Sequence, residues 1–236
     1  MTQPGTSAST QYINSRGLFF IIVVVGLIVV AEILLFPFYR CQVSGPLSKS
    51  ILARIFLGNI AIYLTAGVLG LYFASRLNLP LWYSGNSGLP DSRQVSFISL
   101  LLGLGTVAAN TLYMLSLLDQ AQVVDQTHWF FCLTPRTAAA LSFKAALTEE
   151  IFFRLFLFPV ITWAFDHFLH LREVSLVFGA LLSQFFFGLC HGQAMLVALF
   201  VGFSLIYIYY KRGLVPVMVI HFFADAIPFV LISMRL

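Results

Sequence analysis

The stretch "ALTEEIFFRLFLFP", Ala146 to Pro159, places two glutamates and an arginine inside a segment that is otherwise strongly apolar. A charged side chain near the centre of a bilayer costs about 3 kcal/mol or more, so such residues usually face a protein interior or a water-filled cavity. Glu149, Glu150 and Arg154 therefore indicate a membrane helix whose charged face is covered by other helices.

The composition is that of an integral, multi-pass membrane protein. Of 236 residues, 60% are hydrophobic and 9% are charged, whereas soluble domains are about half apolar and roughly a quarter charged. Apolar segments extend from Gly17 almost to the C-terminus, with no polar stretch long enough to fold separately. The formal charge of +4 comes from scattered basic residues without a basic run, so we predict no nucleic-acid partner.

The spacing of the apolar segments predicts an all-α fold. A bilayer core of about 30 Å requires roughly 20 apolar residues per helix. The segments that meet this length are 17–38, 51–73, 95–118, a long segment from Thr137 to about His170 that Pro159 kinks or breaks, 174–190, 194–210 and 214–233. We therefore predict a polytopic transmembrane helical bundle of seven or eight membrane helices. The small size of the chain and the lack of appended domains favour a prokaryotic cell membrane as its location.

Few features bear on the orientation of the chain in the membrane. Lys211 and Arg212 favour a cytoplasmic turn, although the other basic residues are evenly spread. Cys41, Cys132 and Cys190 are unevenly spaced and contain no CxxC pair, so the sequence indicates neither a disulfide framework nor a thiolate metal site. The redox compartment stays open.

The spacing within the quoted stretch predicts different roles for the two glutamates. Glu150 and Arg154 are four residues apart with the acid on the N-terminal side, which is the favourable order for an i,i+4 ion pair. Glu149 lies about 100° further round the helix, so it points elsewhere and is available for chemistry. The alternative is a buried ion-pair cluster that only fixes helix packing, with Lys144 as a second cation for Glu149. Stability alone does not require such a cluster, because well-packed apolar residues often serve as well.

Three more ionisable residues lie at membrane depth in the second half of the chain. His191 closes the segment "FFFGLCH", in which Phe187 lies one turn before it. His221 and Asp225 are four apart in "VMVIHFFADAIPF" and share one helix face. Alone, each feature fits packing as well as function. Together with Glu149, they supply a glutamate, two histidines and an aspartate from three helices, which could activate a water molecule in a membrane cavity.

Three patterns occur in order, EExxxR at Glu149 to Arg154, FxxxH at Phe187 to His191, and HxxxD at His221 to Asp225. Together they resemble the CPBP family of glutamic-type intramembrane endopeptidases, which contains CAAX proteases and bacteriocin-processing enzymes and is also called Abi. The resemblance covers about residues 137–233. It implies a protease that cuts a membrane-anchored or lipidated protein or peptide near its membrane-embedded, lipidated or C-terminal sorting end.

The resemblance also implies roles for the motif residues. Glu149 with His191 would hold and activate the attacking water, and Glu150 with Arg154 would support them. His221 and Asp225 match positions that resemble an oxyanion-stabilising pair, and Phe187 would pack beside the site. On this basis we divide the chain into a polar N-terminal tail (1–16), N-terminal membrane helices that act as a scaffold (17–136) and a catalytic membrane core (137–236).

Two residues depart from the family pattern. Leu155 stands where glycine often follows the motif arginine. Asp225 stands where asparagine is common, and an ionised aspartate can only accept hydrogen bonds. Either Asp225 is protonated, or it orients a His221 that does the donating, or it binds a metal.

Zinc is an alternative to a metal-free mechanism. Glu149, His191 and His221 would make a His₂Glu set of the kind found in catalytic zinc sites. There is no HExxH motif, and the ligands would come from three helices. We therefore favour a metal-free glutamate mechanism without a cofactor.

Two other functions use the same buried residues. A proton- or ion-coupled transporter would also require acids and histidines at membrane depth, but the sequence has no signal of an inverted repeat. A catalytically inactive relative, acting in immunity or as a scaffold, is the third alternative, and the intact set of motifs disfavours it.

Overall fold

The computed structural model describes residues 15–42, 49–81, 93–119 and 132–235, and these residues form helices and short connections without a strand. Seven of the described helical segments are long and apolar enough to cross a membrane, which confirms the predicted all-α polytopic bundle. Most of the predicted N-terminal tail, residues 1–14, lies outside the described residues. The elements are α1 (Ser15–Leu34), α2 (Phe36–Gln42), α3 (Lys49–Arg76), α4 (Arg93–Asp119), α5 (Pro135–Glu149), the π-helix η3 (Glu150–Leu157), α6 (Phe158–Leu169), α7 (Arg172–Cys190), the 3₁₀ turn η4 (Gly192–Ala194), α8 (Met195–Arg212) and α9 (Leu214–Arg235).

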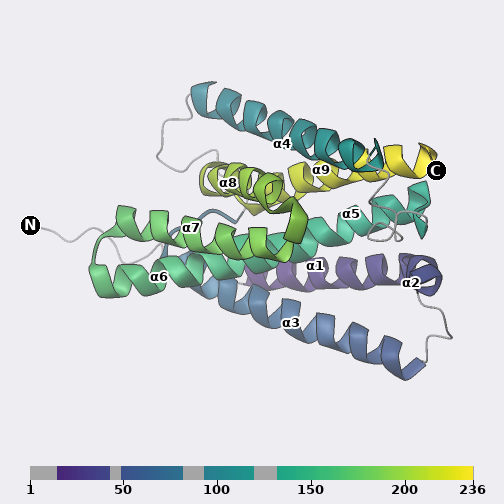
Figure 1. Cartoon of the computed structure of the whole chain (residues 1–236). Helices are drawn as coiled ribbons and strands as arrows, with labels where there is room; N and C mark the ends of the chain where they lie inside the picture. The colour runs from purple at the N-terminus through teal and green to yellow at the C-terminus, as the bar shows by residue number, and fades with distance from the viewer. Residues whose placement is uncertain (1–14, 43–48, 82–92, 120–131, 236) are drawn as a thin grey trace, which may run out of the picture.

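The helices run back and forth along one axis (Figure 1). The short helix α2, the start of α5 and the end of α9 lie at one end of the bundle, on the right in Figure 1. We call this the α2 end. The α6–α7 turn and the α8–α9 turn lie at the opposite end, which we call the α8–α9 end. Helices α5 and α9 pack against each other, α1 packs on α5, and α4 packs on α9.

The first predicted span, 17–38, contains two helices. Helix α1 ends at Leu34, and α2 begins at Phe36. Pro37 follows at once, and a proline has no N–H to donate back to the preceding turn. The membrane helix is therefore shorter than the apolar run suggests.

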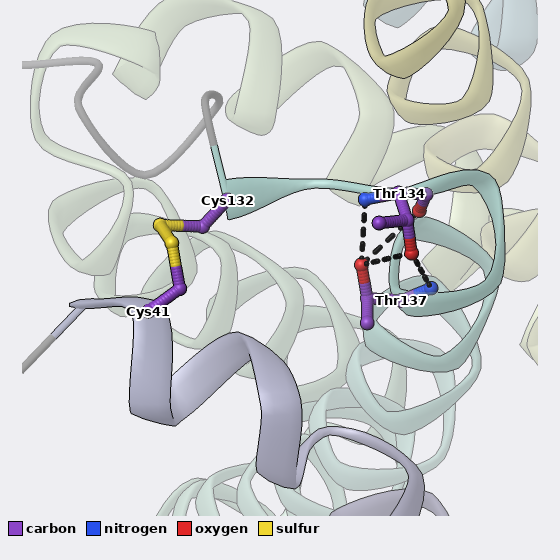
Figure 2. The surroundings of a disulfide bond; sticks show 4 residues. All are labelled: Cys41, Cys132, Thr134 and Thr137. Carbon is purple, nitrogen blue, oxygen red and sulfur yellow. Dashed lines mark hydrogen bonds between the residues drawn. A yellow bond between two sulfur atoms is a disulfide. The ribbon is translucent and has the colours of Figure 1, made fainter.

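The long segment 135–169 is one continuous helical run in which the hydrogen bonding changes twice. It begins with Pro135 in the first turn and with a capping box in which the side chains of Thr134 and Thr137 each accept from the other residue's backbone N–H (Figure 2). Pro159 does not break the run, since it occupies the first turn of α6. The π-helix η3 precedes the proline, and its widened turns carry Glu150 and Arg154, while Glu149 is the last residue of α5. Such turns occur often at functional sites.

Leu155, which stands where glycine often follows the motif arginine, lies against a glycine of α3. Leu155 is fully buried in η3. A Cβ atom added to Gly70 of α3 would lie 2.6 Å from the carbonyl oxygen of Leu155, a distance that real Cβ atoms do not reach. The close approach at this crossing is therefore permitted by a glycine on the facing helix.

A disulfide joins Cys41, at the end of α2, to Cys132, just before α5 (Figure 2). The two residues are 91 positions apart in the sequence, and their Cα atoms are 5.7 Å apart. The expectation from spacing, that the cysteines form no disulfide framework, is corrected for this pair. Spacing could not reveal it, because the two cysteines meet only through tertiary packing, in which α1 lies against α5 and Phe38 of α2 shares a buried cluster with Cys132 and Ala138.

Candidate active site

Three helices bring the predicted site residues together. Glu149 is the last residue of α5, His191 follows the last residue of α7, and His221 lies in the first half of α9. The Oε2 atom of Glu149 is 3.8 Å from Nε2 of His191 and 3.7 Å from Nε2 of His221. These distances exceed those of direct hydrogen bonds. They match groups that a water molecule can bridge.

The hydrogen bonding of His191 fixes which ring nitrogen faces Glu149. Its Nδ1 lies 2.7 Å from the backbone oxygen of Phe187. A carbonyl oxygen can only accept, so Nδ1 carries the proton and donates. In the neutral ring, Nε2 is then an acceptor directed toward Glu149. The ring centroids of Phe187 and His191 are 4.4 Å apart, which places Phe187 beside the site as predicted.

His221 has carboxylates at both ring nitrogens. Its Nδ1 is 2.6 Å from Oε1 of Glu150, and its Nε2 is 3.4 Å from Oδ2 of Asp225. Ionised carboxylates only accept, so this surrounding favours a ring that donates from both nitrogens. The His221 side chain is only 4% exposed, so the arrangement is shielded from solvent.

The ion pair predicted from the i,i+4 spacing is present. Nη1 of Arg154 is 3.2 Å from Oε1 of Glu150, and both side chains are fully buried. The guanidinium also lies over the ring of Phe187, with Cζ 4.2 Å from the ring centroid. Glu150 therefore serves two partners, Arg154 on its own helix and His221 on α9. The second contact was not predicted from the sequence.

Asn110 on α4 is a site neighbour that sequence reasoning missed. Its Nδ2 donates to Oδ1 of Asp225 at 3.0 Å and to the backbone oxygen of Ala224 at 2.9 Å. The signal in the sequence is a single amide within an apolar span, which is weaker than an ionisable residue. Because Asp225 accepts this bond, the aspartate is held between an amide donor and the ring of His221.

Lys144 does not serve as the second cation of Glu149. Its Nζ is 2.7 Å from Oε1 of Glu32 on α1 and donates to the hydroxyl of Tyr39 at 2.9 Å. Glu32 also accepts hydrogen bonds from Asn59 at 2.5 Å and from Tyr39 at 2.7 Å. Burial, together with the bond to Glu32, raises the pKa of the Tyr39 hydroxyl, so Tyr39 stays protonated and donates. The alternative of one cluster that joins Lys144 to Glu149 is therefore wrong, because Lys144 pairs with Glu32 and Glu149 faces the two histidines.

The arrangement of these side chains does not fit a metal ion as it stands. Among residues 15–42, 49–81, 93–119 and 132–235, no group of three His, Cys, Asp or Glu side chains is gathered closely enough to hold one. We therefore derive no step through zinc.

The order of the three motifs and their convergence on one site suggest a comparison with known proteases. Residues 132–227 match the Rce1-like family. Its description is type II CAAX prenyl endopeptidase Rce1-like. The recognition of CAAX proteases from the three motifs is confirmed over this segment. Searches of the curated proteins and of the solved structures found no match.

The Rce1-like segment contains each of the predicted site residues, which are Glu149, Glu150, Arg154, Phe187, His191, His221 and Asp225. The match supports a CAAX-type intramembrane protease in general terms. Asn110 and Glu32 lie outside the segment, although one holds Asp225 and the other holds Lys144 on the helix that ends in Glu149. The N-terminal helices thus contribute polar contacts to the Rce1-like segment as well as packing.

Proposed function

We propose that this chain is an intramembrane endopeptidase that hydrolyses a peptide bond with a glutamate-activated water. The observation that carries the proposal is the position of Glu149, whose Oε2 faces the Nε2 atoms of two histidines at 3.8 Å and 3.7 Å. Its neighbour Glu150 is already neutralised by Arg154. Two adjacent acids thus have different surroundings, and the one without a cationic partner on its own helix is the better candidate for a base.

In this mechanism the attacking water donates one hydrogen to Glu149 and the other to Nε2 of His191. Glu149 removes a proton as the water oxygen bonds to the carbonyl carbon of the substrate. The resulting tetrahedral intermediate carries a negative oxygen, and the peptide C–N bond then breaks. The proton passes from Glu149, directly or through His191, to the nitrogen of the departing amine. The hydroxyl group of the water thus becomes part of the new carboxyl group, and the proton that Glu149 removed is transferred to the amine product.

His221 is the donor that we assign to the negative oxygen of the intermediate. Its Nδ1 is engaged with Glu150, and its Nε2 is directed into the site at only 3.4 Å from Asp225. Such a weakly held N–H can turn to a developing oxyanion, where one donor accounts for about 10² to 10³ in rate. Of the three alternatives for Asp225, orientation of His221 has the best support, because Asp225 accepts from Asn110.

The substrate that we propose is a membrane-anchored or lipidated protein or peptide, cut near its membrane-embedded, lipidated or C-terminal sorting end. A site formed by side chains within spans favours a substrate that is itself held in the bilayer. The location that we propose is a prokaryotic cell membrane. A proton- or ion-coupled transporter gains no specific support from this geometry.

Two substitutions test the proposed function. Glu149→Ala and His191→Ala should each lower the cleavage rate at least about 10²-fold, because each removes a group that handles the water. Both proteins should still accumulate in the membrane, since neither residue belongs to the buried Glu150–Arg154 pair. The assay compares new protein termini in membranes that contain the original chain or the Glu149→Ala variant. Full cleavage by either variant would exclude the assignment.

A further inference from the structure

The polar site becomes more exposed along each of its three helices in the same direction. On α5 and η3, side-chain exposure rises from 0% at Arg154 to 28% at Glu149. On α7 it rises from a buried Phe187 to 32% at His191. On α9 it rises from 4% at His221 to 17% at Asp225. Each of these steps leads toward the start of α5 and the ends of α7 and α9, so the site opens toward the α2 end of the bundle.

The turn between α7 and α8 lies beside this opening. Cys190, Gly192 and Gln193 are exposed, and they flank His191 in the chain. Helix α7 ends in the middle of the bundle, short of the first turns of α5 (Figure 1). On the other side of the motif positions the site residues are buried, with Arg154 at 0% and Phe187 at 1% exposure.

The disulfide lies at the same end as the opening. Cys41 and Cys132 join α2 to the start of α5, at the right of Figure 1. Disulfides form and persist in oxidising compartments and are rare in the cytosol. The α2 end therefore belongs on the non-cytoplasmic side of the membrane.

The distribution of basic residues is compatible with this orientation. Among the side chains that the structure describes, the α8–α9 end carries five basic residues, which are Arg16, Arg76, Arg172, Lys211 and Arg212, and the α2 end carries four, which are Arg40, Arg54, Arg136 and Arg235. The nearly equal numbers of basic residues at the two ends do not fix the orientation in the membrane. The adjacent charges of Lys211 and Arg212 favour a cytoplasmic location for the α8–α9 end. The disulfide is the stronger indicator.

We infer that the catalytic site opens to the non-cytoplasmic face and that its substrate is a protein anchored in the membrane with its cleavable segment exposed on that face. This inference rests on the proposed function. It selects a translocated membrane-anchored protein, such as one with a C-terminal sorting tail. A protein held by a lipid anchor in the cytoplasmic leaflet would present its C-terminus at the α8–α9 end, away from the opening.

The first experiment places the C-terminus of the full chain. Helix α9 ends at Arg235 at the α2 end. In bacterial cells, a fusion of alkaline phosphatase after the last residue should be active, because this enzyme folds only outside the cytoplasm. A matched fusion to a green fluorescent protein that matures only in the cytoplasm should be dark. Fluorescence from the second fusion would overturn the inference.

The second experiment tests the disulfide in the membrane. After acid trapping and denaturation, a thiol-reactive polyethylene glycol should add once to the unreduced chain, at Cys190, and three times after reduction, because the chain has three cysteines. The control variant Cys41→Ser should add the reagent twice without reductant. Three additions to the unreduced original chain would overturn the inference.

A third experiment addresses the substrate and separates the two proposals. A membrane-anchored reporter peptide is presented on either face of the membrane, and cleavage that depends on Glu149 should occur only for the non-cytoplasmic one. Cleavage of the cytoplasmic reporter alone would overturn the orientation and leave the proposed protease activity intact. The fusion and alkylation readouts require no cleavage, so loss of the proposed function would leave them unchanged.

Discussion

Replacement of Glu150 by alanine should destabilise the fold, although the adjacent Glu149 can be replaced without that effect. Glu150 is fully buried and contacts two groups, with Arg154 at 3.2 Å and His221 at 2.6 Å. The substitution leaves a buried guanidinium with no carboxylate partner. It also removes the acceptor that fixes the ring of His221. Loss of stability and loss of activity should therefore occur together.

The magnitude follows from the cost of an uncompensated buried charge. Removal of one partner of a buried ion pair costs about 3–5 kcal/mol. For chains of roughly 150–250 residues, 1 kcal/mol shifts the melting temperature by about 2–4 °C. We therefore expect Glu150→Ala to melt about 6–20 °C below the original chain.

The assay is thermal unfolding of the purified protein in detergent, with Glu149→Ala as the matched control. The control should melt within about 2 °C of the original chain, since Oε2 of Glu149 makes no direct hydrogen bond. A double variant, Glu150→Leu with Arg154→Leu, should recover part of the lost stability because both buried charges are gone. If Glu150→Ala melts like the original chain, the argument from buried charge is refuted.

Three further predictions concern groups that support the site and the question of metal. Asn110→Leu should lower the cleavage rate by about 10²-fold with little change in melting temperature, because it removes the amide that holds Asp225; an unchanged rate would show that this contact is dispensable. Glu32→Gln should lower the melting temperature, since Lys144 loses its carboxylate, and Glu32→Leu with Lys144→Met should restore part of it. A double variant less stable than Glu32→Gln would contradict this view of the pair. Cleavage should survive exhaustive chelation, and loss of activity that zinc alone restores would refute the metal-free mechanism.

Much of the fold and part of the site follow from the sequence because the signals are local. The length of an apolar run determines whether a helix can cross the membrane, and the seven spans among the described residues confirm that reasoning. The pairing of Glu150 with Arg154 also follows, since residues four apart share one face of a helix. The three motifs were sufficient to recognise a protease family over the second half of the chain, which the match at 132–227 confirms.

The packing of the helices decided the rest, because it joins residues whose separation in the sequence carries no signal. His221 meets Glu150 across 71 positions, and Asn110 meets Asp225 across 115. The partner of Lys144 proved to be Glu32, whose helix precedes it by more than 100 positions. These contacts depend on which helices lie side by side and on how far each is shifted along the bundle axis. For the same reason only the tertiary structure reveals that the site opens toward the end of the bundle where Cys41 and Cys132 are joined.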